Sequence, residues 1–165
     1  MYGNTVKDGS GNAWWILVDS EGRIVTNGDS LLSSLQSEVS LDSSDKTITV
    51  PASTVWEISS IMLSLITTAT AGNRQVAVLF TDGSDNVVME IRAGAVQAAS
   101  LTRYYAIAPG LPDLTSFRDT NYLSTPLPAG IILPAGYKIR MYDKAAIDAA
   151  ADTLSVRMMV KSKAA

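Results

Sequence analysis

A repeated Pro-Ala-Gly turn in the C-terminal part constrains the fold of this chain most. The tetrapeptide Leu-Pro-Ala-Gly at 127–130 recurs at 133–136, and residues 137–142 then alternate apolar and polar side chains. Proline fixes φ and glycine supplies a position with positive φ, so such a turn sets the entry of a strand. A period of two sends one strand face inward and the other outward. The pattern predicts a half-buried β-strand, and similar patterns recur from about Lys46 to Lys161.

Turn signals separate about eight strand-like segments at the spacing typical of a sandwich or jelly roll. The apolar face changes parity near Ser59 and Ser60, which predicts a β-bulge. The alanine-rich segment 143–152 favours one or two helical turns or an ordered loop. The predicted strands are 46–50, 54–68, 75–80, 87–92, 97–108, 121–126, 129–133, 137–142 and 153–161. The sequence thus predicts an all-β fold, an antiparallel jelly-roll-like β-sandwich with an N-terminal extended arm.

Residues 1–45 are richer in Gly, Ser, Asn and Asp than the rest and predict the arm. Within them, the apolar run 13–18 and the run 23–26 flank a Gly-containing turn, which is typical of a β-hairpin. The Ser/Asp-rich stretch 29–45 favours a linker over a short helix, because Ser and Asp side chains compete for backbone hydrogen bonds. We therefore expect an arm over 1–45 and a β-sandwich body over 46–165.

Adjacent tryptophans make the hairpin the best candidate for partner contact. Trp14 and Trp15 fall on opposite faces of the predicted strand, so one of them needs a surface beyond the hairpin. An isolated two-stranded hairpin is marginal in water and needs a partner. Either both tryptophans pack on the sandwich, or the hairpin docks on a neighbouring subunit. We take Trp14, Trp15, Ile16 and Val18 as the candidate partner-contact residues.

Missing residue types argue against several function classes. The chain has no cysteine and no histidine, which removes thiol chemistry, the commonest general base and the commonest metal ligand. Its 13 basic and 16 acidic residues form no basic block, so no nucleic-acid partner is expected. We find no bilayer-spanning run and no signal-peptide pattern, so we expect no membrane partner and cytoplasmic synthesis. We expect no enzymatic activity, no cofactor and no metal.

Weaker signals have both a chemical and a structural interpretation. The turn at 82–86 resembles the start of a calcium loop, but it lacks the glutamate that completes one, so an ordinary hairpin turn is preferred. Loop aspartates could bind a cation or act as a glycosidase pair, although such residues usually cap turns. They are Asp113, Asp119, Asp143, Asp148 and Asp152. Tyrosines could form a sugar-binding surface: Tyr104, Tyr105, Tyr122, Tyr137 and Tyr142.

Strand-and-turn motifs across most of the chain carry a family resemblance. They are ITVPA (48–52), VWEI (55–58), TTATAGNR (67–74), QAAS (97–100), APGL (108–111), TPLP (125–128) and LPAGY (133–137), with WILVDSEGRIV (15–25) in the arm. The body resembles the jelly-roll capsid cement or decoration proteins of tailed bacteriophages, and the arm resembles N-terminal extensions of phage structural proteins.

The resemblance implies a structural virion protein made in the host cytoplasm. It would bind the outside of the capsid, cement neighbouring major capsid protein subunits and form a homo-oligomer, a dimer or a trimer. Many identical capsid sites would add modest contacts together. Two alternatives stay open: a neck, tail or fibre-base component of a virion, and a carbohydrate-binding β-sandwich module.

Overall fold

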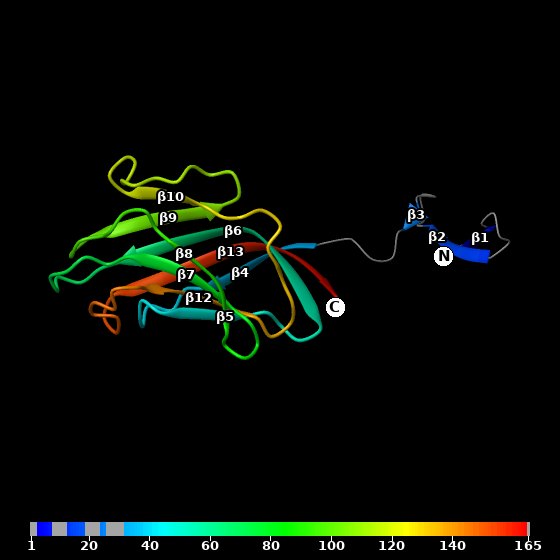
Figure 1. Ribbon diagram of the computed structural model, residues 1–165, viewed down its shortest axis with the longest axis horizontal. Helices are drawn as coiled ribbons and strands as arrows, with labels where there is room; N and C mark the ends of the chain where they lie inside the picture. The colour runs from blue at the N-terminus through cyan, green and yellow to red at the C-terminus, as the bar shows by residue number, and fades with distance from the viewer. Residues whose placement is uncertain (1–2, 8–12, 19–23, 26–31, 165) are drawn as a thin grey trace. The chain divides into compact units, whose positions relative to one another are not determined.

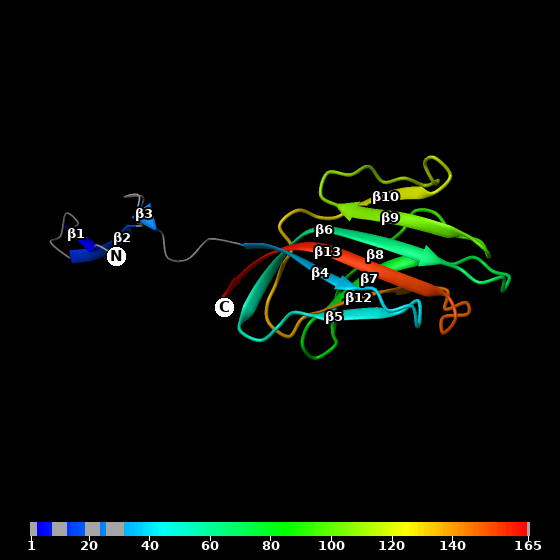
Figure 2. The same ribbon diagram turned by 180° about the vertical axis from the view of Figure 1, so that it is seen from behind.

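The computed structural model describes residues 3–7, 13–18, 24–25 and 32–164, and every regular element in them is a β-strand (Figure 1). The chain divides into two compact units, Met1–Leu31 and Leu32–Ala165. The larger unit is a two-layered sandwich when seen from either side (Figures 1 and 2). The predicted all-β sandwich is therefore confirmed.

The larger unit contains two sheets. Its strands are β4 (Leu32–Glu38), β5 (Lys46–Thr49), β6 (Thr54–Ile66), β7 (Val76–Thr81), β8 (Val87–Arg92), β9 (Thr102–Ala108), β10 (Tyr122–Pro126), β11 (Ile132–Leu133), β12 (Lys138–Asp143) and β13 (Thr153–Ala164). One sheet has the order β10-β9-β6-β13-β4, with the short β11 paired to β6. The other has the order β5-β12-β7-β8.

Strand pairing shows that the sandwich is a jelly roll. Strands far apart in the sequence pair antiparallel: β4 with β13, β5 with β12 and β6 with β9, while β7 and β8 form the closing hairpin. This is one long hairpin folded back on itself. The β13–β6 and β12–β7 pairs then join its halves into two sheets. Such double winding is the topology of a jelly roll.

Strand β4 corrects the prediction of a linker. Residues 32–38 pair with β13 along their whole length, from Leu32 opposite Ser162 to Glu38 opposite Val156. The compact unit therefore begins at Leu32, whereas the sequence placed the start of the body at Lys46. Three serines lower the β-propensity of this stretch, but a partner strand supplies backbone hydrogen bonds that override it.

Strand β10 departs from the expected antiparallel pattern. It pairs parallel to β9, with Tyr122 opposite Tyr104 and Pro126 opposite Ala108. A parallel pair needs a crossover connection rather than a tight turn. The loop 109–120 provides the necessary length. Strand β9 also starts later than predicted, at Thr102, and residues 144–152 form turns without a helix.

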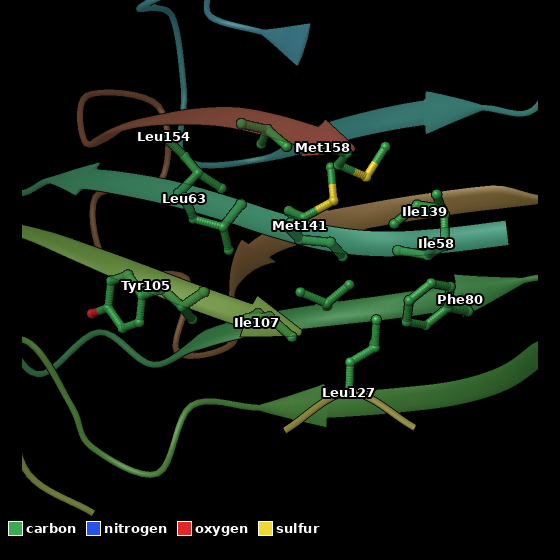
Figure 3. Close-up of a cluster of buried hydrophobic side chains, with 14 of the residues drawn as sticks. Ile58, Leu63, Phe80, Tyr105, Ile107, Leu127, Ile139, Met141, Leu154 and Met158 are labelled. Atoms are coloured by element: carbon green, nitrogen blue, oxygen red, sulfur yellow. The ribbon is translucent and has the colours of Figure 1, made fainter. Parts of the chain in front are cut away.

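The core lies between the two sheets and is made of the inward positions of both (Figure 3). In β6 the register shifts so that Met159 faces Ser60 and Val160 faces Ile58. Ser59 is the extra residue, which confirms the predicted bulge. Because of this bulge, the even-numbered residues before Ser59 and the odd-numbered residues after Ser60 both point into the core. The buried β6 residues are Trp56, Ile58, Ile61, Leu63 and Leu65.

The smaller unit contains three strands, β1 (Gly3–Lys7), β2 (Ala13–Val18) and β3 (Ile24–Val25), in the order β1-β2-β3. Strands β2 and β3 pair antiparallel, as the predicted hairpin requires. The turn between them lies outside the described residues. Strand β1 was not predicted, because a five-residue segment that begins with Gly and Asn has little β-propensity.

Candidate interaction surfaces

The outer face of the four-stranded sheet is rich in paired charges, although Val87 and Val88 are exposed on β8. Its charged side chains form the ion pairs Arg140–Asp45, Lys138–Asp85, Arg92–Glu90 and Lys144–Glu90. The Arg140 Nε lies 3.0 Å from both carboxylate oxygens of Asp45. The hydrogen bond from Arg92 holds the pKa of Glu90 below its usual range. This is what a solvated sheet face is expected to look like.

The outer face of the six-stranded sheet carries fewer charges in its middle. At one end, outward Lys161 and Glu57 form an ion pair. The register places the central outward residues in three rows across the strands: Leu35, Met159 and Ser60; then Ser37, Arg157, Met62, Ala106 and Ser124; then Ser155, Ser64, Tyr104 and Tyr122. We call these residues the outer apolar face. The loop 109–120 borders this face at Ala106 and Ser124.

Large apolar side chains on this face are open to solvent. Leu35 is 59% exposed, Tyr122 47%, Met62 42% and Met159 41%. Tyr104 and Tyr122 stack with their ring centroids 4.9 Å apart and their planes at 21°. Exposed methionine, leucine and tyrosine gathered on one sheet face are typical of an interaction site.

Arg157 is the charged residue of the outer apolar face. Among the described residues it has no hydrogen bond and no ion pair. It lines a hollow of about 160 Å³ together with Met62, Tyr104, Tyr122 and the hydroxyls of Ser64 and Ser155. Ligand pockets usually measure about 300–1,000 Å³. The hollow is therefore small for an organic ligand, but it suits a side chain from another protein surface.

An apolar groove of about 450 Å³ lies beside β10 and continues the outer apolar face. Leu111, Pro112, Leu114 and Arg118 of the loop 109–120 form one wall, and strand residues including Tyr122 form the other. The loop is held in place by Leu114 N–H, which donates to the Ser124 carbonyl at 3.1 Å. The Ser124 hydroxyl also donates to the Pro112 carbonyl at 2.9 Å.

A buried ion pair ties the loop ends of the sandwich together. Arg74 and Asp152 are both fully buried, and Arg74 Nε donates to Asp152 Oδ2 at 2.7 Å. Arg74 Nη1 also donates to the carbonyls of Thr70 and Gly72, at 2.7 and 2.9 Å. The hydrogen bond from Asp152 raises the pKa of Arg74. These contacts join the backbone at 70–72 to Asp152 at the end of the sandwich.

Three of the five candidate loop aspartates gather around Arg74: Asp143, Asp148 and Asp152. Asp143 accepts hydrogen bonds from the backbone N–H groups of Gln75, Ala145 and Ile147, at 2.8, 3.0 and 3.0 Å. Asp148 accepts the hydroxyls of Thr68 and Thr70, which lower its pKa.

The other two aspartates, Asp113 and Asp119, lie in the loop before β10. Within the described part of the chain, no group of three or more His, Cys, Asp or Glu side chains is placed to hold a metal ion.

Two weaker signals remain, the turn at 82–86 and the candidate tyrosines. The turn at 82–86 joins β7 to β8, and the Asp82 carboxylate accepts hydrogen bonds from Ser84 N–H and Asn86 N–H, at 2.8 and 2.9 Å. The tyrosines do not form one surface. Tyr105 is buried, and its burial raises its pKa. Tyr142 is on β12 of the other sheet, so only Tyr104 and Tyr122 meet.

The predicted partner-contact residues all lie on β2, the middle strand of the smaller unit. Backbone pairing sets Trp14 opposite Val6, Trp15 opposite Thr5 and Ile16 opposite Asn4. Val18 pairs with Ile24 of β3. Their side chains lie outside the described part of the structure, so their contact role stays a prediction.

The sequence did contain one signal of the outer apolar face. The stretches 61–66 and 158–160 are apolar at both parities, whereas a strand solvated on one face alternates. Met62 and Met159 are the large apolar residues at outward positions of these two stretches. In the described part of the chain, no helix is long and apolar enough to cross a bilayer.

Comparison with known proteins does not assign a family to this chain. No family model and no curated protein matches the sequence. Several of the solved structures that match weakly are of viruses. One, from infectious bursal disease virus Gx strain, is 13% identical with a TM-score of 0.36, over 96% of this chain and 37% of that chain. A chain of turnip yellow mosaic virus is 11% identical with a TM-score of 0.31, over 91% of this chain and 89% of that chain.

A VP2 subviral particle of infectious bursal disease virus gives 12% identity and a TM-score of 0.32, over 98% of this chain and 38% of that chain. This protein thus spans little more than a third of the length of the infectious bursal disease virus chains. The fold assignment rests on the strand pairing described above: the chain is an all-β protein whose larger unit is a jelly roll.

Proposed function

We propose that this protein is a structural component of a virion that binds the outside of a phage capsid and cements neighbouring major capsid subunits. Its role would be non-catalytic, with attachment through the strand-rich smaller unit. The proposal draws on the family resemblance of the strand-and-turn motifs and on the jelly roll.

One observation carries the proposal: residues 1–31 form a compact unit of their own whose middle strand is Ala-Trp-Trp-Ile-Leu-Val. A single layer of three short strands cannot bury both of its faces. A unit of this size is too small to build an independent core. An apolar central strand in such a unit therefore favours attachment to a partner surface. A capsid repeats that surface many times, so weak contacts add up.

Binding to purified capsids tests this role. We expect the double substitution Trp14→Ala, Trp15→Ala in the full chain to reduce co-sedimentation with capsids at least tenfold. A matched double substitution, Val87→Ala, Val88→Ala, alters two exposed apolar residues of β8 and should leave binding unchanged. Equal capsid occupancy by the tryptophan variant and the wild type would refute the attachment role of the arm.

Copy number separates the shell from the alternative position at a neck, tail or fibre base. Quantifying the protein per particle by mass spectrometry should give hundreds of copies for a cement protein. A dozen or fewer copies would place it in the neck or tail instead.

The carbohydrate-binding alternative has one supporting observation, the stacked Tyr104 and Tyr122 beside Arg157. Aromatic faces and a guanidinium are suitable for an acidic sugar. The hollow of about 160 Å³ is about half the lower limit of ordinary ligand pockets, so the protein-contact role is preferred. Binding on a glycan array that is lost in Tyr122→Ala would favour the sugar.

A further inference from the structure

We propose that the outer apolar face is a dimer interface, and that its occupant is the same face of a second copy of this chain related by a two-fold axis parallel to β6. The proposal names the surface for self-association and does not depend on the virion role. It rests on the apolar character of the face, its size and its self-complementarity.

The area of the outer apolar face can be compared with that of known protein interfaces. Five strands at about 4.8 Å spacing span roughly 24 Å, and three rows of outward residues at about 6.8 Å span roughly 20 Å. The projected area is about 500 Å², and the corrugated accessible surface is larger. Two such faces would bury about 1,000 Å² in total, which is at the lower limit for a specific interface.

The order of the strands makes the face complementary to itself. In a two-fold contact, residue i meets residue j and j meets i. An axis parallel to β6 sets β13 against β9 of the second copy, and β4 against β10, because these strands are equally distant from β6. Leu35 projects from β4, and the apolar groove lies beside β10. Rotation about this axis keeps each residue in its own row, so Leu35 would meet Pro126 of the second copy, one row away from the groove residues.

This arrangement also gives Arg157 a contact with the second copy. It stands on β13 and would face β9 and β10 of the second copy, where Tyr104 and Tyr122 stack. A guanidinium over a tyrosine ring is a favourable contact once water is excluded. The pairing would give Arg157 an attractive partner while keeping the two arginines apart, on opposite sides of the axis.

Met62 would lie on the axis and face its own copy, which permits a sharp test. The native mass of the full wild-type chain, measured by sedimentation velocity at micromolar concentration, should be twice the chain mass. Met62→Glu and Met62→Lys each place like charges against each other, and each should raise the dimer dissociation constant at least a hundredfold. A mixture of the two variants should form heterodimers, because the opposite charges then meet across the axis.

Matched substitutions at the edges provide the control. Leu35→Glu should raise the dissociation constant at least tenfold, because its carboxylate would be buried against the apolar Pro126 of the second copy. Val88→Glu alters a side chain of nearly the same exposure, 58%, on β8 of the other sheet and should leave the dimer intact. Thermal unfolding of each variant verifies that the chain is folded.

Several outcomes would overturn the assignment. They are a wild-type monomer, a trimer, a dimer lost in Val88→Glu but kept in Leu35→Glu, and Met62 variants that do not complement each other. A monomer that binds capsids or a sugar through this face would also exclude the second copy as its occupant. Because the measurement uses the purified chain without capsids, its failure would leave the arm experiment unaffected.

Discussion

Replacing Asp152 with alanine should destabilise the sandwich more than any comparable change to a surface ion pair. The carboxylate accepts Arg74 Nε at 2.7 Å and Arg74 Nη2 at 3.2 Å, and it also accepts the Thr68 backbone N–H at 2.7 Å. Both charged side chains have 0% exposure. The substitution therefore leaves a buried guanidinium without its counter-ion and a backbone donor without its acceptor.

The expected cost follows from that geometry. Removing one partner of a buried ion pair costs about 3–5 kcal/mol. A domain of this size has a total stability of about 5–15 kcal/mol, so the loss is a large fraction of the whole. With a shift of about 2–4 °C per kcal/mol, Tm should fall by roughly 6–20 °C. Thermal and urea unfolding at one fixed protein concentration measure it, because self-association would shift Tm with concentration.

The exposed pair Arg140–Asp45 provides the control. Both side chains are close to half-exposed, so Asp45→Ala should cost less than about 1 kcal/mol. In the double variant Arg74→Met, Asp152→Ala no unpaired charge is left, so its loss should be smaller than the sum of the two single losses. A Tm for Asp152→Ala equal to that of Asp45→Ala, or strict additivity in the double variant, would refute the reasoning.

Two further predictions concern the same sandwich. The hydroxyls of Thr68 and Thr70 hold the pKa of Asp148 below its unfolded value, so this carboxylate stabilises the fold above about pH 4 and loses that effect as pH falls through the lowered pKa. Asp148→Asn should therefore flatten the acid side of a plot of urea midpoint against pH, and a curve parallel to the wild type would contradict this. A Cβ at Gly94 would lie 2.4 Å from the Leu114 carbonyl oxygen, so Gly94→Ala should cost about 1–3 kcal/mol by forcing the loop 109–120 outward. Gly83→Ala is the matched control, because Gly83, like Gly94, has no positive φ and its added Cβ would meet no atom closer than 3.8 Å; an equal Tm for the two variants would exclude the clash as the cause.

Local patterns in the sequence determined most of the strands. The alternation at 137–142 became β12, the parity change near Ser59 became a bulge, and the turn at 82–86 joined two strands, because each depends on neighbours in the chain. The antiparallel pairing of β2 with β3 belongs to the same group. Side-chain period and turn chemistry are short-range properties, so one sequence is enough to reveal them.

Only the tertiary structure decided what depends on contacts between distant segments. Strand β4 exists because β13 offers a partner edge, and β10 runs parallel to β9 because a long loop carries the chain across. Arg74 meets Asp152 across 78 positions of sequence, so nothing local marks either residue as part of a pair. The outer apolar face likewise gathers residues from five strands. Off-parity methionines hint at it, but the strand order alone places Leu35, Met62, Arg157 and Tyr122 on one surface, because adjacency in a sheet is set by pairing rather than by position in the chain.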